Sequence, residues 1–337
     1  MKRRELLKQF GSLAVTAASS VLMLSESHPQ PASKRPAICF LAGQWADPAP
    51  EVLVEDSFRS LVRGLSDLGY SPGRNYELLP RLPMVPDLEP TTEELANRVK
   101  PDVIVAAATL EAVAMRKATS TIPIVCSALA DAVHLGLIAS EAHPGGNLTG
   151  IQPYIRGLPT KQIELAREIL PQAKRIGLLT DMADPKGPPQ LGDLQTASEA
   201  FAVETVAANV SVPDELPRAI DSLAAAKVDL VVVTMANIFL QLSDRVAALA
   251  LERRLPTVFG YREHVITGGF VSYGVDLKWC FHREAYFVDK ILKGTRPGDL
   301  PIEFPTQFPL AVNLRTAKAL GVTLPPSLLA RADEVVE

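Results

Sequence analysis

The sequence carries the same short pattern twice: an aspartate, an apolar run rich in β-branched residues, and then a predicted helix. KPDVIVAAAT occupies residues 100–109, and KVDLVVVTMA occupies residues 227–236. A short run of this kind, bounded by polar residues, is typical of a buried parallel strand. After the next predicted helix, each copy is followed by a strand that begins near a proline, in STIPIVCSA and in RRLPTVFGY. We therefore interpret the two regions as corresponding parts of an internal repeat.

Strands and helices also alternate on both sides of these repeats. RPAICFLAG precedes a stretch in which Val54, Phe58 and Leu61 recur at helical spacing, and the same order restarts at AKRIGLLT after residue 170. Such alternation predicts a parallel sheet with helices on both faces. A chain of 337 residues is too long for one ordinary core and suits two lobes of roughly 150 residues each. We expect an α/β protein built from two doubly wound lobes.

The segments after residue 270 complete neither lobe alone. We expect them to cross back to the first lobe and return, which with a crossing near residues 147–151 makes three linking strands. Three links between two similar lobes form a hinge, and the cleft between the lobes can then close. The predicted division gives residues 36–150 plus 271–303 to the N-terminal lobe and residues 151–270 plus 304–337 to the C-terminal lobe.

The first 33 residues differ in character from the rest. A basic head, MKRRELLK, precedes a mildly apolar stretch at residues 10–24 and then the polar SESHPQPASK. This is the layout of an export signal, and the apolar stretch is too short to span a bilayer stably. The arginine pair also resembles the twin-arginine export motif, with Leu6 where that motif usually has Phe. We expect residues 1–33 to be a signal peptide and the protein to be periplasmic, exported by the twin-arginine or the general route; the alternative is a basic helix retained in a cytosolic protein.

Composition and cysteine placement exclude several classes of site. The net charge is -4 with 21% charged residues, so no large basic face for nucleic acid is indicated. Cys39 and Cys126 lie in strand-like apolar runs and Cys280 in a predicted helix, as expected of buried hydrophobic residues. The sequence has no CxxC, HExxH or Cys/His cluster, so we expect neither a metal site nor a cofactor.

Enzyme motifs of this fold class are also missing from the sequence. A phosphate-binding enzyme needs a glycine-rich turn after its first strand, whereas LAGQWADPAP has one glycine and a bulky tryptophan. HPGGNLTG follows a short segment and is interpreted as a turn into a linking strand, and no GxSxG nucleophile motif occurs. We expect no catalytic residues, and a Rossmann-like enzyme is the least favoured alternative.

Four stretches give the sequence a family resemblance. STIPIV, HPGGNLTGI, RRLPTVFGYREHVITGGFVSYGVD and the segment from VDKILKGTRPGDLP to LLARADEVV are similar to the substrate-binding proteins of bacterial ABC transporters. The resemblance covers about residues 36–335 and is to the branch with the type I periplasmic-binding fold that includes tryptophan-binding relatives. It implies a monomer that binds a small molecule and delivers it to a permease and its ATPase in the inner membrane. Residues 108–110 and 130–132 depart from the family's usual Gly-Thr-Pro and Gly-Asp-Pro at expected ligand loops.

Polar and aromatic residues follow predicted strand ends in both lobes, and as a set they favour a ligand cleft. Each has a structural alternative: covering a loop for the tryptophan, capping the next helix for Thr109 and the aspartates, and pairing with Glu263 for the arginine. The predicted ligand-binding residues are Trp45, Thr109, Asp131, Asn237, Tyr261, Arg262 and Asp276.

The types of residue in this set suggest the class of ligand. Arg262 suits a carboxylate and Asp131 or Asp276 suits an amine, while the aromatic residues offer stacking surface. A small amino acid or aromatic carboxylate fits these groups, and the family resemblance points the same way. The expected function is therefore solute binding for an ABC uptake transporter; the alternative is a periplasmic sensor that signals to a membrane kinase or chemoreceptor.

Overall fold

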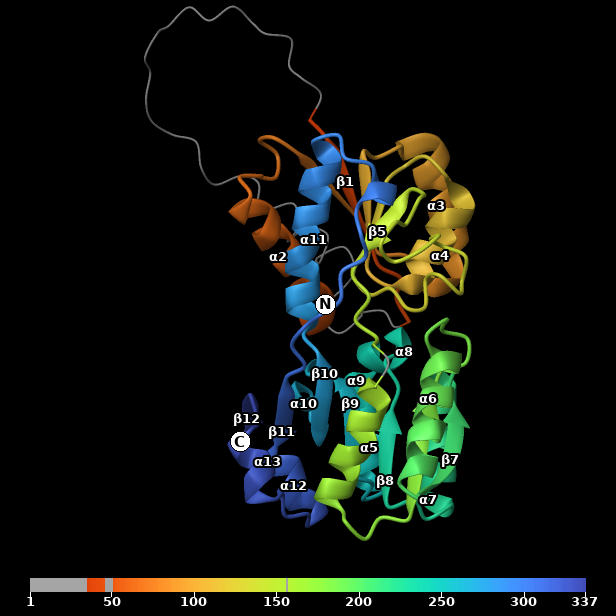
Figure 1. The fold of residues 1–337 in the computed structure, drawn as a ribbon, viewed down its shortest axis with the longest axis vertical. Coiled ribbons are helices and arrows are strands. Elements are labelled where there is room, and N and C mark those ends of the chain that lie inside the picture. Colours follow the sequence, from red (N-terminus) through yellow and green to blue (C-terminus); the bar gives the residue numbers. More distant parts are fainter. Residues whose placement is uncertain (1–34, 46–50, 156) are drawn as a thin grey trace, which may run out of the picture.

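The computed structural model describes residues 35–45, 51–155 and 157–337. The predicted signal peptide lies outside these residues. The described chain forms two α/β lobes stacked end to end, one around a five-stranded sheet and one around a seven-stranded sheet (Figure 1).

The first sheet is wholly parallel and has the order β2-β1-β3-β4-β5. Along β1, Ile38 and Phe40 belong to one apolar cluster, whereas Cys39 and Leu41 belong to another on the opposite face. This alternation is the period-two pattern of a strand buried on both faces. The strands are β1 (Ala37–Leu41), β2 (Glu77–Arg81), β3 (Val103–Ala106), β4 (Ile124–Cys126) and β5 (Leu148–Gly150).

Helices cover both faces of this sheet (Figure 1). One face packs against α2 (Glu51–Asp67) and α11 (Leu277–Leu292), although α11 comes from far along the chain. The other packs against α3 (Leu88–Glu94), η2 (Leu95–Val99) and α4 (Thr109–Ala118).

The second sheet has the order β12-β11-β10-β9-β8-β6-β7 and is parallel except for the antiparallel pair β10–β11. Helices α5, α6, α12 and α13 pack on one face, and α7, α8 and α9 pack on the other. The strands are β6 (Arg175–Thr180), β7 (Glu204–Asn209), β8 (Leu230–Val233), β9 (Thr257–Tyr261), β10 (Val271–Val275), β11 (Leu310–Asn313) and β12 (Glu334–Val336). The helices are α5 (Leu158–Ile169), α6 (Gly187–Ala200), α7 (Leu216–Ala225), α8 (Asn237–Gln241), α9 (Ser243–Glu252), α10 (Glu263–Ile266), α12 (Leu314–Leu320) and α13 (Pro326–Ala330).

The chain passes between the two lobes three times: after β5, at Asp276 between β10 and α11, and through residues 303–309 before β11. The first and third passages lie side by side, because Ile151 and Glu303 form a parallel bridge. The predicted fold, two doubly wound lobes joined by three links, is confirmed.

One predicted boundary is wrong. Residues 271–275 were expected in the N-terminal lobe, but Val271 and Ser272 pair with both β9 and β11 in the second sheet. The return crossing therefore comes after β10, at Asp276. The antiparallel pair β10–β11 was likewise not expected, and it arises because β11 returns from the first lobe and enters the sheet in the opposite direction.

Candidate functional site

A cavity of about 60 Å³ lies where the carboxyl ends of strands from the two sheets face each other. Loops after β1, β3 and β4 approach it from the first lobe, and loops after β6, β8 and β9 approach it from the second. This is the place where open α/β sheets bind ligands. The lining residues are Phe40, Ala42, Gly43, Ser57, Ala107, Ala108, Glu111, Ala128, Lys186, Asn237, Leu240, Gln241, Tyr261, Leu277 and Phe281.

Gln241 connects the lobes directly at one edge of the cavity. Its Nε2 donates to the Gly43 carbonyl at 2.7 Å, and its Oε1 accepts from the Trp45 backbone N–H at 2.7 Å. The partly buried Trp45 side chain also packs against the apolar cluster of the second lobe. The structure is thus a closed arrangement in which a side chain of α8 holds the loop that follows β1.

Glu111 supplies a buried carboxyl group from the first lobe. It lies in the first turn of α4, and its two oxygens accept from the backbone N–H of Gly43 at 2.7 Å and of Ala108 at 3.1 Å. Burial raises the pKa of this carboxyl to about 7, although the backbone bond from Gly43 lowers it in part. The group therefore changes its charge near neutral pH.

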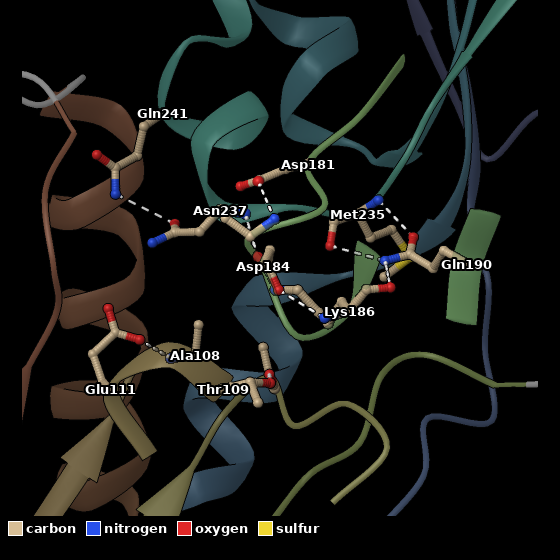
Figure 2. A network of polar contacts seen from close by, with 12 residues as sticks. Ala108, Thr109, Glu111, Asp181, Asp184, Lys186, Gln190, Met235, Asn237 and Gln241 are labelled. Atoms are coloured by element: carbon tan, nitrogen blue, oxygen red, sulfur yellow. Dashed lines mark hydrogen bonds and ion pairs between the residues drawn. The ribbon is translucent and has the colours of Figure 1, made fainter. Parts of the chain in front are cut away.

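Lys186 supplies a buried cation from the second lobe (Figure 2). Its side chain is 2% exposed, and its Nζ lies 3.4 Å from Asp184 Oδ2. Burial lowers the pKa of Lys186, but the charges of Asp184, Tyr261 and Glu111 outweigh this effect and raise the pKa above its ordinary value. The side chain remains charged at neutral pH, and Lys186 is one of the residues that line the cavity.

The polar residues of the second lobe are held in place by backbone hydrogen bonds. Asp184 Oδ1 accepts from Lys186 N at 2.9 Å, and Asp184 Oδ2 accepts from Asn237 N at 3.2 Å. Gln190 donates to the carbonyls of Lys186 and Met235 and accepts from Met235 N at 2.7 Å (Figure 2). These bonds connect the loop after β6 to the loop after β8, so the cation does not depend on a flexible loop for its position.

Aromatic and aliphatic side chains form the remaining walls. The rings of Phe40 and Phe281 lie 6.1 Å apart, and Leu277 lies one turn before Phe281 on α11. Tyr261 is 2% exposed, and burial raises the pKa of its phenol to about 12. The site therefore joins an apolar interior to two buried charged groups on opposite lobes.

Four of the predicted site residues lie at this junction. Asn237 and Tyr261 line the cavity, and Trp45 bonds to Gln241 at its edge. Thr109 begins α4 beside the cavity, but its hydroxyl donates to the Ala128 carbonyl at 2.9 Å within the first lobe.

The other three do not line the cavity. Arg262 was predicted to bind ligand, but it pairs with Glu334 of β12, with Nη2 2.9 Å from Oε1; the alternative partner, Glu263, is not the residue it bonds to. Asp276 caps α11 by accepting from Lys278 N at 2.9 Å, and it borders a separate open groove along the hinge. Asp131 takes a left-handed backbone conformation with φ 46°, and its carbonyl accepts from Leu135 N at 3.0 Å.

The sequence analysis missed Lys186, Glu111 and Gln241. Lys186 follows AKRIGLLT in the loop DMADPKG, a strand end of the same kind as those that were considered. In open α/β sheets ligands bind beyond the carboxyl ends of the strands, and considering the residues after β6 in this way would have found Lys186. Glu111 and Gln241 lie within or at the end of helices, and nothing in their local sequence distinguishes them from solvent-exposed helix residues.

Residues 35–45, 51–155 and 157–337 contain no group of three or more His, Cys, Asp or Glu side chains arranged to hold a metal ion. No helix in these segments is both long and apolar enough to cross a membrane.

The family model for ABC transporter substrate binding proteins matches residues 61–336. A tyrosine-binding protein of Clostridioides difficile (strain R20291) is 28% identical over 267 residues, which cover 78% of this chain and 76% of the relative.

Solved structures share the fold. One is a conserved domain protein from Vibrio cholerae, with a TM-score of 0.81 and 25% identity over 90% of this chain and 100% of that chain. Another is the ABC domain from Streptococcus pneumonia in complex with L-Trp, with a TM-score of 0.79 and 21% identity over 90% of this chain and 100% of that chain. The chain belongs to the ABC transporter substrate-binding protein family.

Proposed function

We propose that this chain is the solute-binding component of an ABC uptake transporter and that it binds a small organic carboxylate, either an amino acid or an aromatic carboxylate, between its lobes. Family membership supports the class of function. The similarity to a tyrosine-binding protein and to a structure holding L-Trp supports an aromatic amino acid as the type of solute.

The observation that carries this proposal is the pair of charged groups facing the cavity from opposite lobes. The Lys186 ammonium can bind the carboxylate of the solute, and the Glu111 carboxylate can bind its amine. Hydrogen bonds to ionised groups are about twice as strong as neutral ones, and burial excludes competing water. Phe40, Phe281 and Leu277 offer apolar contact to the rest of the solute.

The size of the cavity indicates how binding is coupled to motion. About 60 Å³ is far below the roughly 300–1,000 Å³ of typical ligand pockets, so a solute as large as an amino acid requires the lobes to separate before it enters. A solute that contacts both lobes then stabilises a closed form around itself. In this proposal the protein carries out no chemical step; it binds, closes and presents the closed form to the membrane permease and its ATPase.

The proposed location follows from residues 1–33, whose layout supports export across the cytoplasmic membrane. We infer that the exported protein acts as a monomer in the periplasm, where it meets solute before transport.

Binding to the purified protein from about residue 28 onward tests the proposal. We expect isothermal titration calorimetry to detect one site for at least one amino acid or aromatic carboxylate, without metal or nucleotide. Ligand at 100 times its Kd adds about 2.7 kcal/mol to the free energy of unfolding, so the same compound raises the Tm. A panel of these compounds that neither releases heat nor changes the Tm would contradict the proposed solute class, and tight binding of a dinucleotide would contradict the function.

A further inference from the structure

Glu284 is a fully buried carboxylic acid on α11 that the site described above does not use. Both of its carboxyl oxygens are buried and lack a hydrogen-bond partner among the described residues. The hydroxyl of Ser127, in the loop directly after β4, is also buried without a partner. Burial raises the pKa of Glu284 well above its ordinary value, and the nearby Ser127 hydroxyl lowers this pKa only in part. The Ser127 hydroxyl and the Glu284 carboxyl do not have the geometry of a regular hydrogen bond. Burial therefore favours the neutral form of this carboxyl group.

Both residues lie next to cavity-lining residues. Ser127 immediately precedes Ala128, and Glu284 lies three residues after Phe281, which places it on the same face of α11 one turn further into the first lobe. Ser127 and Ala128 both follow the end of β4, and Ala128 lines the cavity, so Ser127 lies at the strand end that the cavity borders.

An unpartnered buried carboxyl group reduces stability, because the group loses its hydrogen bonds to water and gains none in the protein. Proteins commonly accept such a cost where a polar group serves binding. A neutral carboxyl group offers one O–H donor and acceptor oxygens, and a serine hydroxyl offers the same pair of functions. Together they match a hydroxyl group, which both donates and accepts.

We propose that Ser127 and Glu284 form the far end of the solute site and bind a hydroxyl group on the ring of the solute, whose carboxylate is held by Lys186 in the opposite lobe. The inference rests on the proposed function and narrows its solute class to hydroxylated aromatic carboxylates, including amino acids with a phenol ring. Neither Ser127 nor Glu284 lines the present cavity, so in this proposal the lobes separate and the side chains near Phe281 rearrange as the solute enters.

L-Tyrosine and L-phenylalanine test this inference, because they differ only in the ring hydroxyl. Calorimetry on the wild-type protein at pH 7 should show tyrosine binding tighter than phenylalanine by at least about tenfold, since a site built around a hydroxyl rejects an analogue that lacks it. Glu284→Leu should abolish this ratio by weakening tyrosine alone. Glu284→Gln retains a donor and an acceptor and should preserve most of the ratio.

Glu263→Gln provides a matched control, because Glu263 is also buried, also has an unpartnered Oε2 and does not line the cavity. Burial raises the pKa of Glu263 to about 7. For both glutamates the folded protein favours the neutral acid, so the wild type loses stability as the pH rises above the ordinary pKa of a glutamate. Both glutamine variants should therefore melt higher than the wild type at pH 8, whereas the Glu263 variant leaves the tyrosine-to-phenylalanine ratio unchanged.

The other outcomes separate this inference from the proposed function. Equal affinity for the two amino acids in the wild type, or an unchanged ratio in Glu284→Leu, overturns the hydroxyl site and leaves solute binding intact. Failure of every amino acid and aromatic carboxylate to bind overturns the proposed function and this inference with it. If Glu284→Leu does not fold, Ser127→Ala replaces it, and an unchanged ratio in that variant counts against the site.

Discussion

At the scale of single residues, the candidate site depends on placing charge where water cannot reach it. Lys186 is 2% exposed and Glu111 is fully buried, so each would be costly without partners. The protein supplies them locally: Asp184 lies beside the cation, and two backbone N–H groups bond to the carboxyl of Glu111. These partners keep the charged groups in place before a solute arrives, which lowers the ordering cost of binding.

Replacing Lys186 with methionine should weaken carboxylate binding, because it removes the charge with little change in side-chain length. We expect the affinity for a carboxylate solute to fall by about 1.5–3 kcal/mol, the contribution of a hydrogen bond to a charged group. The affinity for the corresponding amide should change little, because an amide carries no charge for the lysine to bind. Lys161→Met, which removes a lysine whose side chain is 59% exposed, serves as the control. Equal losses for acid and amide would show that Lys186 supports the fold instead of binding solute.

The pKa of Glu111, about 7, predicts a pH dependence of amino-acid binding. The carboxyl is mostly neutral at pH 6 and mostly ionised at pH 8, and only the ionised form attracts the ammonium group of a solute. Affinity for an amino acid should therefore rise between pH 6 and pH 8, whereas affinity for a carboxylate without an amine should not. Titration calorimetry across this range checks both, and Glu111→Gln should remove the rise. A rise that persists in this variant would mean that another group is responsible.

At the scale of elements, α11 determines much of the shape of the site. Helix α11 directly follows β10 of the second sheet, but it lies in the first lobe and packs along α2 (Figure 1). Its first turns carry Leu277 and Phe281 to the cavity wall, and its N-terminus is capped by Asp276 at the crossing between lobes. The close approach to α2 depends on Gly64, because a Cβ atom there would lie 2.3 Å from the His282 carbonyl oxygen.

Gly64→Ala should therefore destabilise the protein although alanine favours helices. Alanine gains about 1 kcal/mol of helix propensity over glycine, but forcing α2 and α11 apart costs about 1–3 kcal/mol. Gly192→Ala, in α6, provides a contrast because a Cβ atom there would contact nothing within 4 Å, and this variant should be stabilised. Urea denaturation measures both. Equal stabilisation of the two variants would mean that α2 and α11 shift apart without penalty.

At the scale of the whole molecule, the two lobes are held closed by contacts that are small relative to the lobes. Three chain passages join them, and the bonds from Gln241 to Gly43 and Trp45 connect residues nearly 200 positions apart in the sequence, at separations of 198 and 196. A few contacts of this kind can set the balance between open and closed forms, because each form keeps its own lobe cores intact.

Gln241→Ala should shift the solute-free protein toward the open form. We expect small-angle X-ray scattering to show a larger radius of gyration for this variant than for the wild type without solute, and equal radii at saturating solute. The apparent affinity of this variant for the solute should fall in proportion to the decrease in the fraction of molecules that are closed without solute. Gln307→Ala, at an exposed position of the third passage, serves as the control. An unchanged radius in the solute-free Gln241 variant would mean that other contacts keep the lobes closed.

The sequence by itself determined the type of fold, because the evidence for it is local. Apolar runs such as Leu230–Val233 and helical repeats such as Phe58 and Leu61 reflect burial within one strand or one helix. Their repetition in order along the chain predicted two lobes and three passages between them. At the site, the search for polar and aromatic residues after strand ends pointed to Asn237 and Tyr261, and the structure places both on the wall of the cavity.

Only the tertiary structure decided which charged groups face that cavity. Arg262 follows a strand end as Tyr261 does, yet Glu334, 72 residues later, pairs with it away from the cavity. Lys186 and Glu111 instead line the cavity from opposite lobes. Lys186 follows the end of β6, a strand end that the sequence shows, whereas the local sequence of Glu111 resembles that of an ordinary surface helix residue. A side chain's partner depends on which distant segments the fold brings beside it, and in this molecule those segments belong to opposite lobes and to the returning C-terminal strand.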